Sequence, residues 1–175
     1  GSISLLPLIM YFRNKKAAEG AEEAASASVL VPGIIAGSVL FFGASLQQVG
    51  LAYTTVGKAA FITGLYIVLV PLLGVFFKQR INVNTWLGVV LAVSGLYFLS
   101  VNEDFTIAFG DFLEIIGAFF WAAHILVIDY FTKKMDALEL SSIQFAMCSA
   151  LSIATALIFE DISISGISQA TIPIL

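Results

Sequence analysis

The sequence has few charged residues and a single cysteine, and each scarcity excludes a class of protein. Only 11% of its 175 residues are charged, whereas about a quarter are charged in soluble globular domains. The net charge is -4, which argues against the basic surface that a nucleic-acid partner requires. Cys148 is the one cysteine, so the sequence excludes an internal disulfide and a CxxC metal or redox pair.

The sequence also lacks the short motifs of nucleotide chemistry and hydrolysis. It has no glycine-rich loop ending in GK[ST], no GxSxG or HExxH, and no histidine or cysteine cluster with metal-ligand spacing. We therefore expect no enzyme, no cofactor and no metal site. Transport driven by ATP bound to this chain is not expected either.

Long apolar runs are present instead, and hydrophobic residues make up 59% of the chain. The clearest run is GLAYTTVGKAAFITGLYIVLVPLLGVFF (50–77), whose one charge is Lys58. About twenty apolar residues cross the roughly 30 Å hydrocarbon core of a bilayer as one helix. The sequence therefore predicts an all-α polytopic membrane protein embedded in a lipid bilayer. Further complete spans are expected at 29–53, 82–101, 110–134 and 138–159.

The two ends of the chain carry incomplete apolar runs. Residues 1–12 would form about 18 Å of helix before a basic cluster, and residues 170–175 begin a run that does not continue. We therefore expect an internal piece of a longer protein. The turn at 54–57 is short, which predicts that the spans on either side of it are antiparallel neighbours.

Basic residues fall in alternate loops. Seven of the eight lie in 13–28, 78–82 and 133–137, whereas the intervening loops carry acidic residues. The positive-inside rule places the basic loops in the cytoplasm. Lys58, at an outer helix end, is the exception.

Four stretches, in this order, resemble a known family: SLLPLIMYFRNKK, GLAYTTVGKAAFITGLYIVLVPLLG, TWLGVVLAVSGLYFLSV and GDFLEIIGAFFWAAHILVIDYF. Over nearly its whole length the chain resembles the EamA-type transporters of the drug/metabolite transporter (DMT) superfamily. The resemblance implies ten helices in two five-helix inverted repeats that share a central cavity. It also implies a location in the bacterial inner membrane. On that map the chain runs from late in helix 2 to the start of helix 8.

The same resemblance implies a division of the chain into two repeats. Residues 1–101 would form the first repeat without helix 1 and the start of helix 2. Residues 102–110 would be the inter-repeat loop, and residues 111–175 the truncated start of the second repeat. We expect a secondary transporter that moves a small metabolite, with an amino acid or a related solute as the leading candidate, by alternating access. A non-transporting membrane fragment or scaffold is an alternative, and the sequence indicates no particular oligomeric state.

Polar and aromatic side chains within the spans are the candidates for a substrate site, because lipid penalises buried polar groups. Lys58 would mark the outer mouth, and the others lie about 9 to 20 Å deep at 1.5 Å per residue. That count places Gln47 level with Thr63, and His124 level with Gln144. The alternatives are hydrogen bonds between packed helices and, for Lys58, snorkelling to the headgroups. The candidates are Gln47, Lys58, Thr63, Tyr66, Trp121, His124 and Gln144.

Glu114 has two interpretations. Asp111 and Glu114 form a D-x-x-E pattern, which we interpret as a capping box at the helix start, with Glu114 only about 5 Å inside the helix. Alternatively, the fragment LEIIG resembles the glutamate-bearing helix of the small multidrug resistance proteins. That resemblance implies proton-coupled drug efflux through Glu114.

Small residues and proline are expected to shape the helices. Gly33 and Gly37, four residues apart, should let the backbone of another helix approach closely. Gly64, Pro71 and Gly74 are predicted hinge positions, because proline removes a backbone hydrogen bond and glycine lowers helix stiffness.

Overall fold

The computed structural model describes residues 29–77, 81–100 and 108–159, without the side chains of residues 99 and 100, and also Leu5, Pro7, Met10 and Tyr11. Apart from those last four positions, the predicted half-helix at 1–12 lies outside the described residues. So do the loop at 13–28, most of the inter-repeat loop and the final apolar run.

Every regular element within the described ranges is an α-helix. Four spans are long and apolar enough to cross a membrane: Leu30–Leu51, Val56–Phe76, Phe109–Thr132 and Ala137–Phe159. This confirms the prediction of an all-α polytopic membrane protein. The helices are α2 (Leu30–Leu51), α3 (Val56–Gly64), α4 (Tyr66–Phe76), α5 (Val83–Ser100), α6 (Phe109–Thr132) and α7 (Ala137–Phe159).

Helix α5 occupies Val83–Ser100, within the span that was predicted at 82–101. The helix as a whole has 18 residues, or about 27 Å at 1.5 Å per residue. In addition, α6 begins at Phe109, inside the stretch that was expected to be the loop before residue 111.

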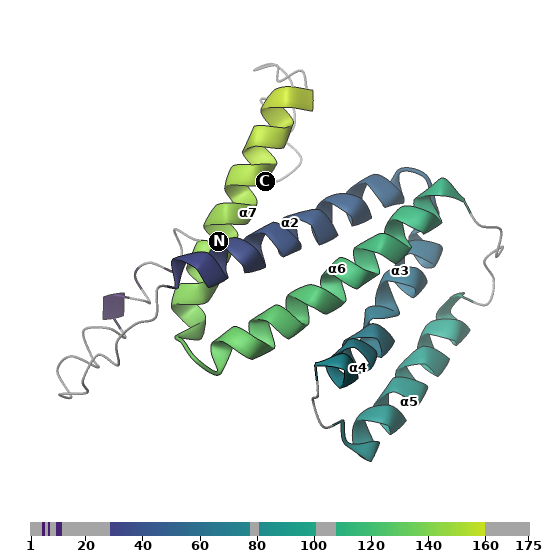
Figure 1. Ribbon diagram of the computed structural model, residues 1–175. Coiled ribbons are helices and arrows are strands. Elements are labelled where there is room, and N and C mark those ends of the chain that lie inside the picture. The colour runs from purple at the N-terminus through teal and green to yellow at the C-terminus, as the bar shows by residue number, and fades with distance from the viewer. Residues whose placement is uncertain are drawn as a thin grey trace.

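Helix α6 lies at the centre of the described bundle (Figure 1). It runs antiparallel to α2, its most extensive partner, and contacts α3 and α4 on another side. Helix α5 packs on α3 and α4, and α7 crosses α2. The spans α2 and α3–α4 touch each other, as neighbours joined by a short turn should, but each makes more contact with α6. The inner helix of this arrangement is therefore the one expected to begin the second repeat.

The crossing of α7 over α2 depends on two glycines. A Cβ atom at Gly33 would lie 2.4 Å from Ile143 Cγ2, and one at Gly37 would lie 2.5 Å from the backbone oxygen of Gln144. Both distances are far shorter than van der Waals contact, so a larger residue would not fit. The prediction that this small-residue pair permits close helix approach is confirmed.

The predicted span at 50–77 is interrupted. Helix α3 ends at Gly64 and α4 begins at Tyr66, and the N–H of Leu65 donates to the carbonyl of Ile62 at 3.1 Å. That i→i−3 bond is a tighter turn than the α-helix makes. The interruption adjoins Gly64, whereas α4 continues through Pro71 and Gly74, which are both buried.

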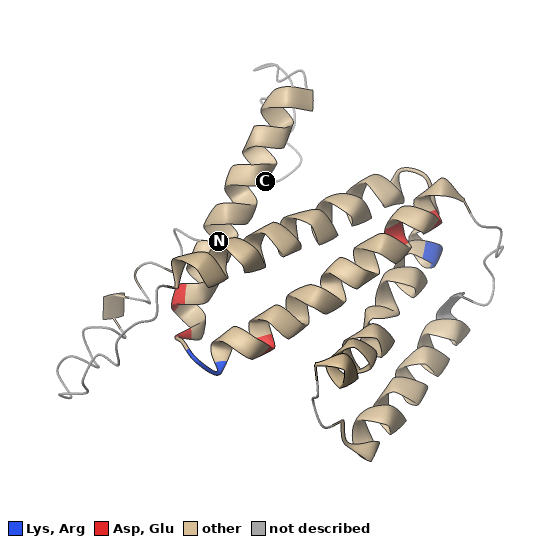
Figure 2. Ribbon diagram, viewed as in Figure 1, with Lys and Arg blue, Asp and Glu red and all other residues tan. Residues whose placement is uncertain are grey.

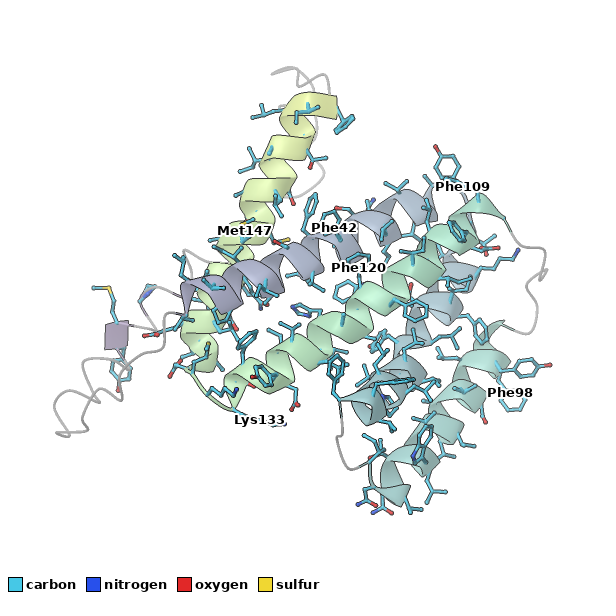
Figure 3. All side chains as sticks on the ribbon, in the orientation of Figure 1. Phe42, Phe98, Phe109, Phe120, Lys133 and Met147 are labelled. Atoms are coloured by element: carbon cyan, nitrogen blue, oxygen red, sulfur yellow. The ribbon has the colours of Figure 1, made fainter. Side chains whose placement is uncertain are left out.

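Large apolar side chains cover the outside of the bundle (Figure 3). The second half of α7 extends away from the other described helices, and Leu157 and Phe159 are 68% and 80% exposed there. Charged positions gather instead toward the ends of the helices (Figure 2). This distribution suits helices whose sides meet lipid or further helices, and whose ends meet water.

Candidate functional site

A hydrogen-bonded chain joins three helices inside the bundle. Gln47 Nε2 on α2 donates to Thr63 Oγ1 on α3 at 3.4 Å, and Thr63 Oγ1 donates to Glu114 Oε2 on α6 at 2.6 Å. Thr63 is 8% exposed and Glu114 is completely buried. The structure thus brings Gln47 and Thr63 together, as their equal depth predicts, and adds Glu114 as the acceptor of the Thr63 hydroxyl.

The interpretation of Asp111 and Glu114 as a capping box is wrong. Ala108 is the N-cap of α6, and Asp111, three residues on, accepts a hydrogen bond from the Ala108 backbone N–H at 2.8 Å. The helix begins earlier than the D-x-x-E pattern suggested, so Asp111 takes the position that was assigned to Glu114. Glu114 lies one turn further in, where its carboxyl group meets Thr63 rather than the helix end.

Two buried polar atoms have no hydrogen-bond partner among the described residues. They are Glu114 Oε1 and the indole nitrogen of Trp121, Nε1. The Glu114 carboxyl group faces Gly50 of α2, where a Cβ atom would lie 2.8 Å from Oε1. A buried polar atom without a partner is costly, at about 1 to 3 kcal/mol, so each is a feature that packing alone does not explain.

An ion pair closes the end of the bundle where α2 ends and α6 begins. The ammonium nitrogen of Lys58 lies 3.9 Å from Asp111 Oδ2, with the two side chains 11% and 6% exposed. The hydroxyl of Thr54 also donates to Asp111. Lys58 is therefore not an isolated positive charge at the outer end, which accounts for its departure from the charge pattern of the loops.

A second polar group lies further along α6. His124 Nε2 and Gln144 Oε1 of α7 are 3.0 Å apart, as expected for residues at one level. The rings of Trp121 and His124 meet edge to face with centroids 6.3 Å apart, and Trp121 packs against Gly43 of α2. Trp121, His124 and Gln144 thus form one group at the junction of α2, α6 and α7.

The remaining candidates are placed less centrally. Tyr66 is half-buried at the first residue of α4, and among the described residues no hydrogen bond joins its hydroxyl to either group. The sequence reasoning missed Thr54 and misjudged Asp111. A lone basic residue at the outer end of one span and an acidic residue at the outer end of another could have suggested their pairing.

An all-helical bundle with membrane-length helices and buried polar groups defines a polytopic membrane protein. The EamA-like transporter family matches residues 1–101, and the chain belongs to that family. This family, whose name describes transporters, belongs to the DMT superfamily.

Two curated relatives support the assignment, and both come from archaea. The chain is 39% identical over 98 residues to an uncharacterized transporter of Archaeoglobus fulgidus, across 55% of this chain and 31% of the relative. It is 28% identical over 102 residues to an uncharacterized transporter of Methanothermobacter thermautotrophicus, across 54% of this chain and 30% of the relative. The matched part is about a third of the length of each relative. No solved structure matches the chain.

Proposed function

We propose that the chain forms part of a secondary transporter that moves a small metabolite, an amino acid or a related solute, by alternating access. The observation that carries this proposal is the group formed by Trp121, His124 and Gln144 inside an apolar bundle. The indole N–H of Trp121 is buried and finds no acceptor among the residues that the structure describes, so a solute that supplies an acceptor would recover the lost hydrogen bond. Membership of a transporter family supports the same conclusion.

The chemistry of this group suits a solute with both donors and acceptors. The imidazole of His124 and the amide of Gln144 each offer a donor and an acceptor, and they are already paired at 3.0 Å. A carboxylate near Trp121 Nε1 and an amino group near Gln144 Oε1 would satisfy both ends of an amino acid. The path between this group and the outer end of the bundle would be lined by Gln47, Thr63, Tyr66 and Lys58.

We further propose that residues 1–101 and 111–175 belong to two repeats that move against each other. Helices α2, α3 and α4 would belong to the first repeat, and α6 and α7 to the second. The chain from Gln47 through Thr63 to Glu114, and the ion pair between Lys58 and Asp111, would then cross the boundary between the repeats. Gly64, Pro71 and Gly74 would absorb the motion in the first repeat.

The proposed location is the cytoplasmic membrane, with the basic loops 13–28, 78–82 and 133–137 on the cytoplasmic side. Because both relatives are archaeal, they lend no support to the bacterial inner membrane in particular. The proposed substrate is a small molecule and the proposed activity is transport without catalysis.

Trp121→Phe in the full-length protein tests the site most directly. This change keeps an aromatic ring against Gly43 and removes the indole N–H. Uptake of a panel of radiolabelled amino acids into proteoliposomes should show an apparent KM raised about tenfold, as the loss of about 1.4 kcal/mol of binding predicts. Trp86→Phe, on the exposed side of α5, is the matched control and should transport normally.

Two results would contradict the proposal. Normal uptake by both Trp121→Phe and Trp121→Ala would remove Trp121 from the site. Absence of uptake of every amino acid by the folded wild-type protein would refute an amino acid as the substrate.

A further inference from the structure

Glu114 is a buried acid whose surroundings do not match those of an ionised carboxylate. It is completely buried in a helix of membrane-spanning length, and Oε2 accepts one hydrogen bond, from Thr63. Oε1 has no partner. A charged carboxylate normally accepts several hydrogen bonds or pairs with a cation, because placing a charge in an apolar interior costs far more than placing a neutral group there.

Asp111, one turn away on the same helix, shows the contrast. It accepts hydrogen bonds from Thr54 and from the backbone of Ala108, and Lys58 lies 3.9 Å away. These partners suit a charged carboxylate at the helix N-terminus, where the helix dipole also favours negative charge. Two acidic groups on one helix, one turn apart, are thus held in opposite kinds of surroundings.

The charged groups around Glu114 do not compensate a second negative charge. Lys58 and Asp111 offset each other, so an ionised Glu114 would leave the cluster with an excess negative charge. Helix α2, which covers Oε1, has no titratable side chain. Glu139 lies in the first turn of α7, which follows the end of α6 opposite to the end that carries Glu114. On the helices that pack against α6, the titratable residues are Lys58 on α3, Tyr66 on α4, and Glu139 and Cys148 on α7.

On the side that faces α2, the residue that covers Glu114 is a glycine, which has no side chain. Gly50 of α2 lies against the carboxyl group, and a Cβ atom at Gly110 would lie 2.5 Å from the Gly50 carbonyl oxygen, so the two helix ends touch through glycines. Glu114 lies about 5 Å inside the position of Asp111, at 1.5 Å per residue. A small separation of the end of α2 from the start of α6 would therefore expose the carboxyl group to water.

We propose that Glu114 is a proton-binding site, occupied while the ends of α2 and α3 are closed on α6 and emptied when they separate. In the closed arrangement the carboxyl group is neutral, with Oε2 accepting from Thr63 and the proton on Oε1. When the helix ends part, the O–H bond of the carboxyl group breaks, the electron pair stays on oxygen and a water molecule takes the proton. The charged carboxylate is then solvated until the proton returns and the ends close.

This inference rests on the arrangement of α2, α3 and α6, not on the identity of the carried solute. Infrared difference spectroscopy of the full-length protein in liposomes tests it without any solute. The wild-type protein should show the C=O band of a protonated carboxyl group at neutral pH, shifted in D2O and lost as the pH is raised. Glu114→Gln should lack this band. Asp129→Asn, which removes a half-exposed carboxylate from the same helix, should keep it.

Variants of Thr63 provide a second way to assign the C=O band to Glu114 without replacing Glu114 itself. Thr63→Val removes the hydrogen bond to Oε2 and should move the C=O band to higher frequency, whereas Thr63→Ser should leave it in place. This pair of variants keeps the test valid if Glu114→Gln does not fold.

Four outcomes would overturn the proposal. The first is absence of the band in the folded wild-type protein at neutral pH, and the second is persistence of the band in folded Glu114→Gln. The third is a band that does not disappear at any pH the folded protein tolerates, since that acid would be permanently neutral. Loss of the band on adding sodium at constant pH would identify a metal cation as the competing ligand instead.

Discussion

Gly37→Ala is predicted to loosen the contact between α2 and α7, and the structure sets the size of the effect. The new Cβ atom would lie 2.5 Å from the backbone oxygen of Gln144 and 2.7 Å from Met147 Cβ, whereas ordinary contact begins at 3.4 Å. The helices would have to move apart by about 0.9 Å, the difference between 2.5 and 3.4 Å. A backbone atom cannot turn aside as a flexible side chain does, so the strain passes to the whole crossing.

The expected cost is at the upper end of the range for overpacking, about 2 to 3 kcal/mol. Replacing glycine by alanine within a helix recovers up to about 1 kcal/mol through helix propensity. The net destabilisation should therefore be about 1 to 2 kcal/mol. The pairing of His124 with Gln144 should weaken as well, because α7 carries Gln144 at this crossing.

Gly88→Ala is the matched control. A Cβ atom at Gly88 in α5 meets nothing within 4 Å among the described residues, so the helix-propensity gain should appear without a clash. Reversible unfolding in mixed micelles, followed by circular dichroism, should show Gly37→Ala less stable than wild type and Gly88→Ala equal or more stable. Equal stability of Gly37→Ala and Gly88→Ala would refute the reasoning that the glycine permits the helix crossing.

Two further predictions concern the helix contacts and the outer ion pair. Leu140→Ala should lower the free energy of unfolding by about 2 kcal/mol, because Leu140 is completely buried. Leu157 is 68% exposed on the same helix, so Leu157→Ala should change that free energy by less than about 0.5 kcal/mol in the same unfolding assay. Asp111→Ala should destabilise more than Lys58→Ala, because Asp111 also accepts from Thr54. A double-mutant cycle should give a coupling of about 1 kcal/mol between Lys58 and Asp111, and strictly additive effects would show that the 3.9 Å contact contributes nothing.

Features that depend on local sequence could be predicted. The bilayer requires long apolar helices, since every backbone group must be satisfied within its own segment, and the predicted spans coincide with α2, with α3 and α4 together, and with α6 and α7. Depth along a helix also follows from residue count, and so the equal levels of Gln47 and Thr63, and of His124 and Gln144, could be anticipated.

The capping error shows where local reasoning stopped. The D-x-x-E pattern at Asp111 and Glu114 is compatible with two helix starts, and the sequence contains no signal strong enough to select Ala108 as the N-cap. Because the later start was chosen, the buried residue Glu114 was interpreted as part of a helix cap. The shift of a few residues changes the depth of Glu114 and therefore its surroundings.

The sequence by itself determined the membrane class, the positions of most spans, the family resemblance and the small-residue pair at Gly33 and Gly37. Only the tertiary structure decided that α6 lies at the centre and that Glu114 meets Thr63, 51 residues earlier in the chain. The physical reason is that lipid is as apolar as the helix surfaces, so hydrophobic patterning does not mark which face packs against which helix. Close fit and hydrogen bonds between distant segments make that choice, and they exist only in the folded bundle.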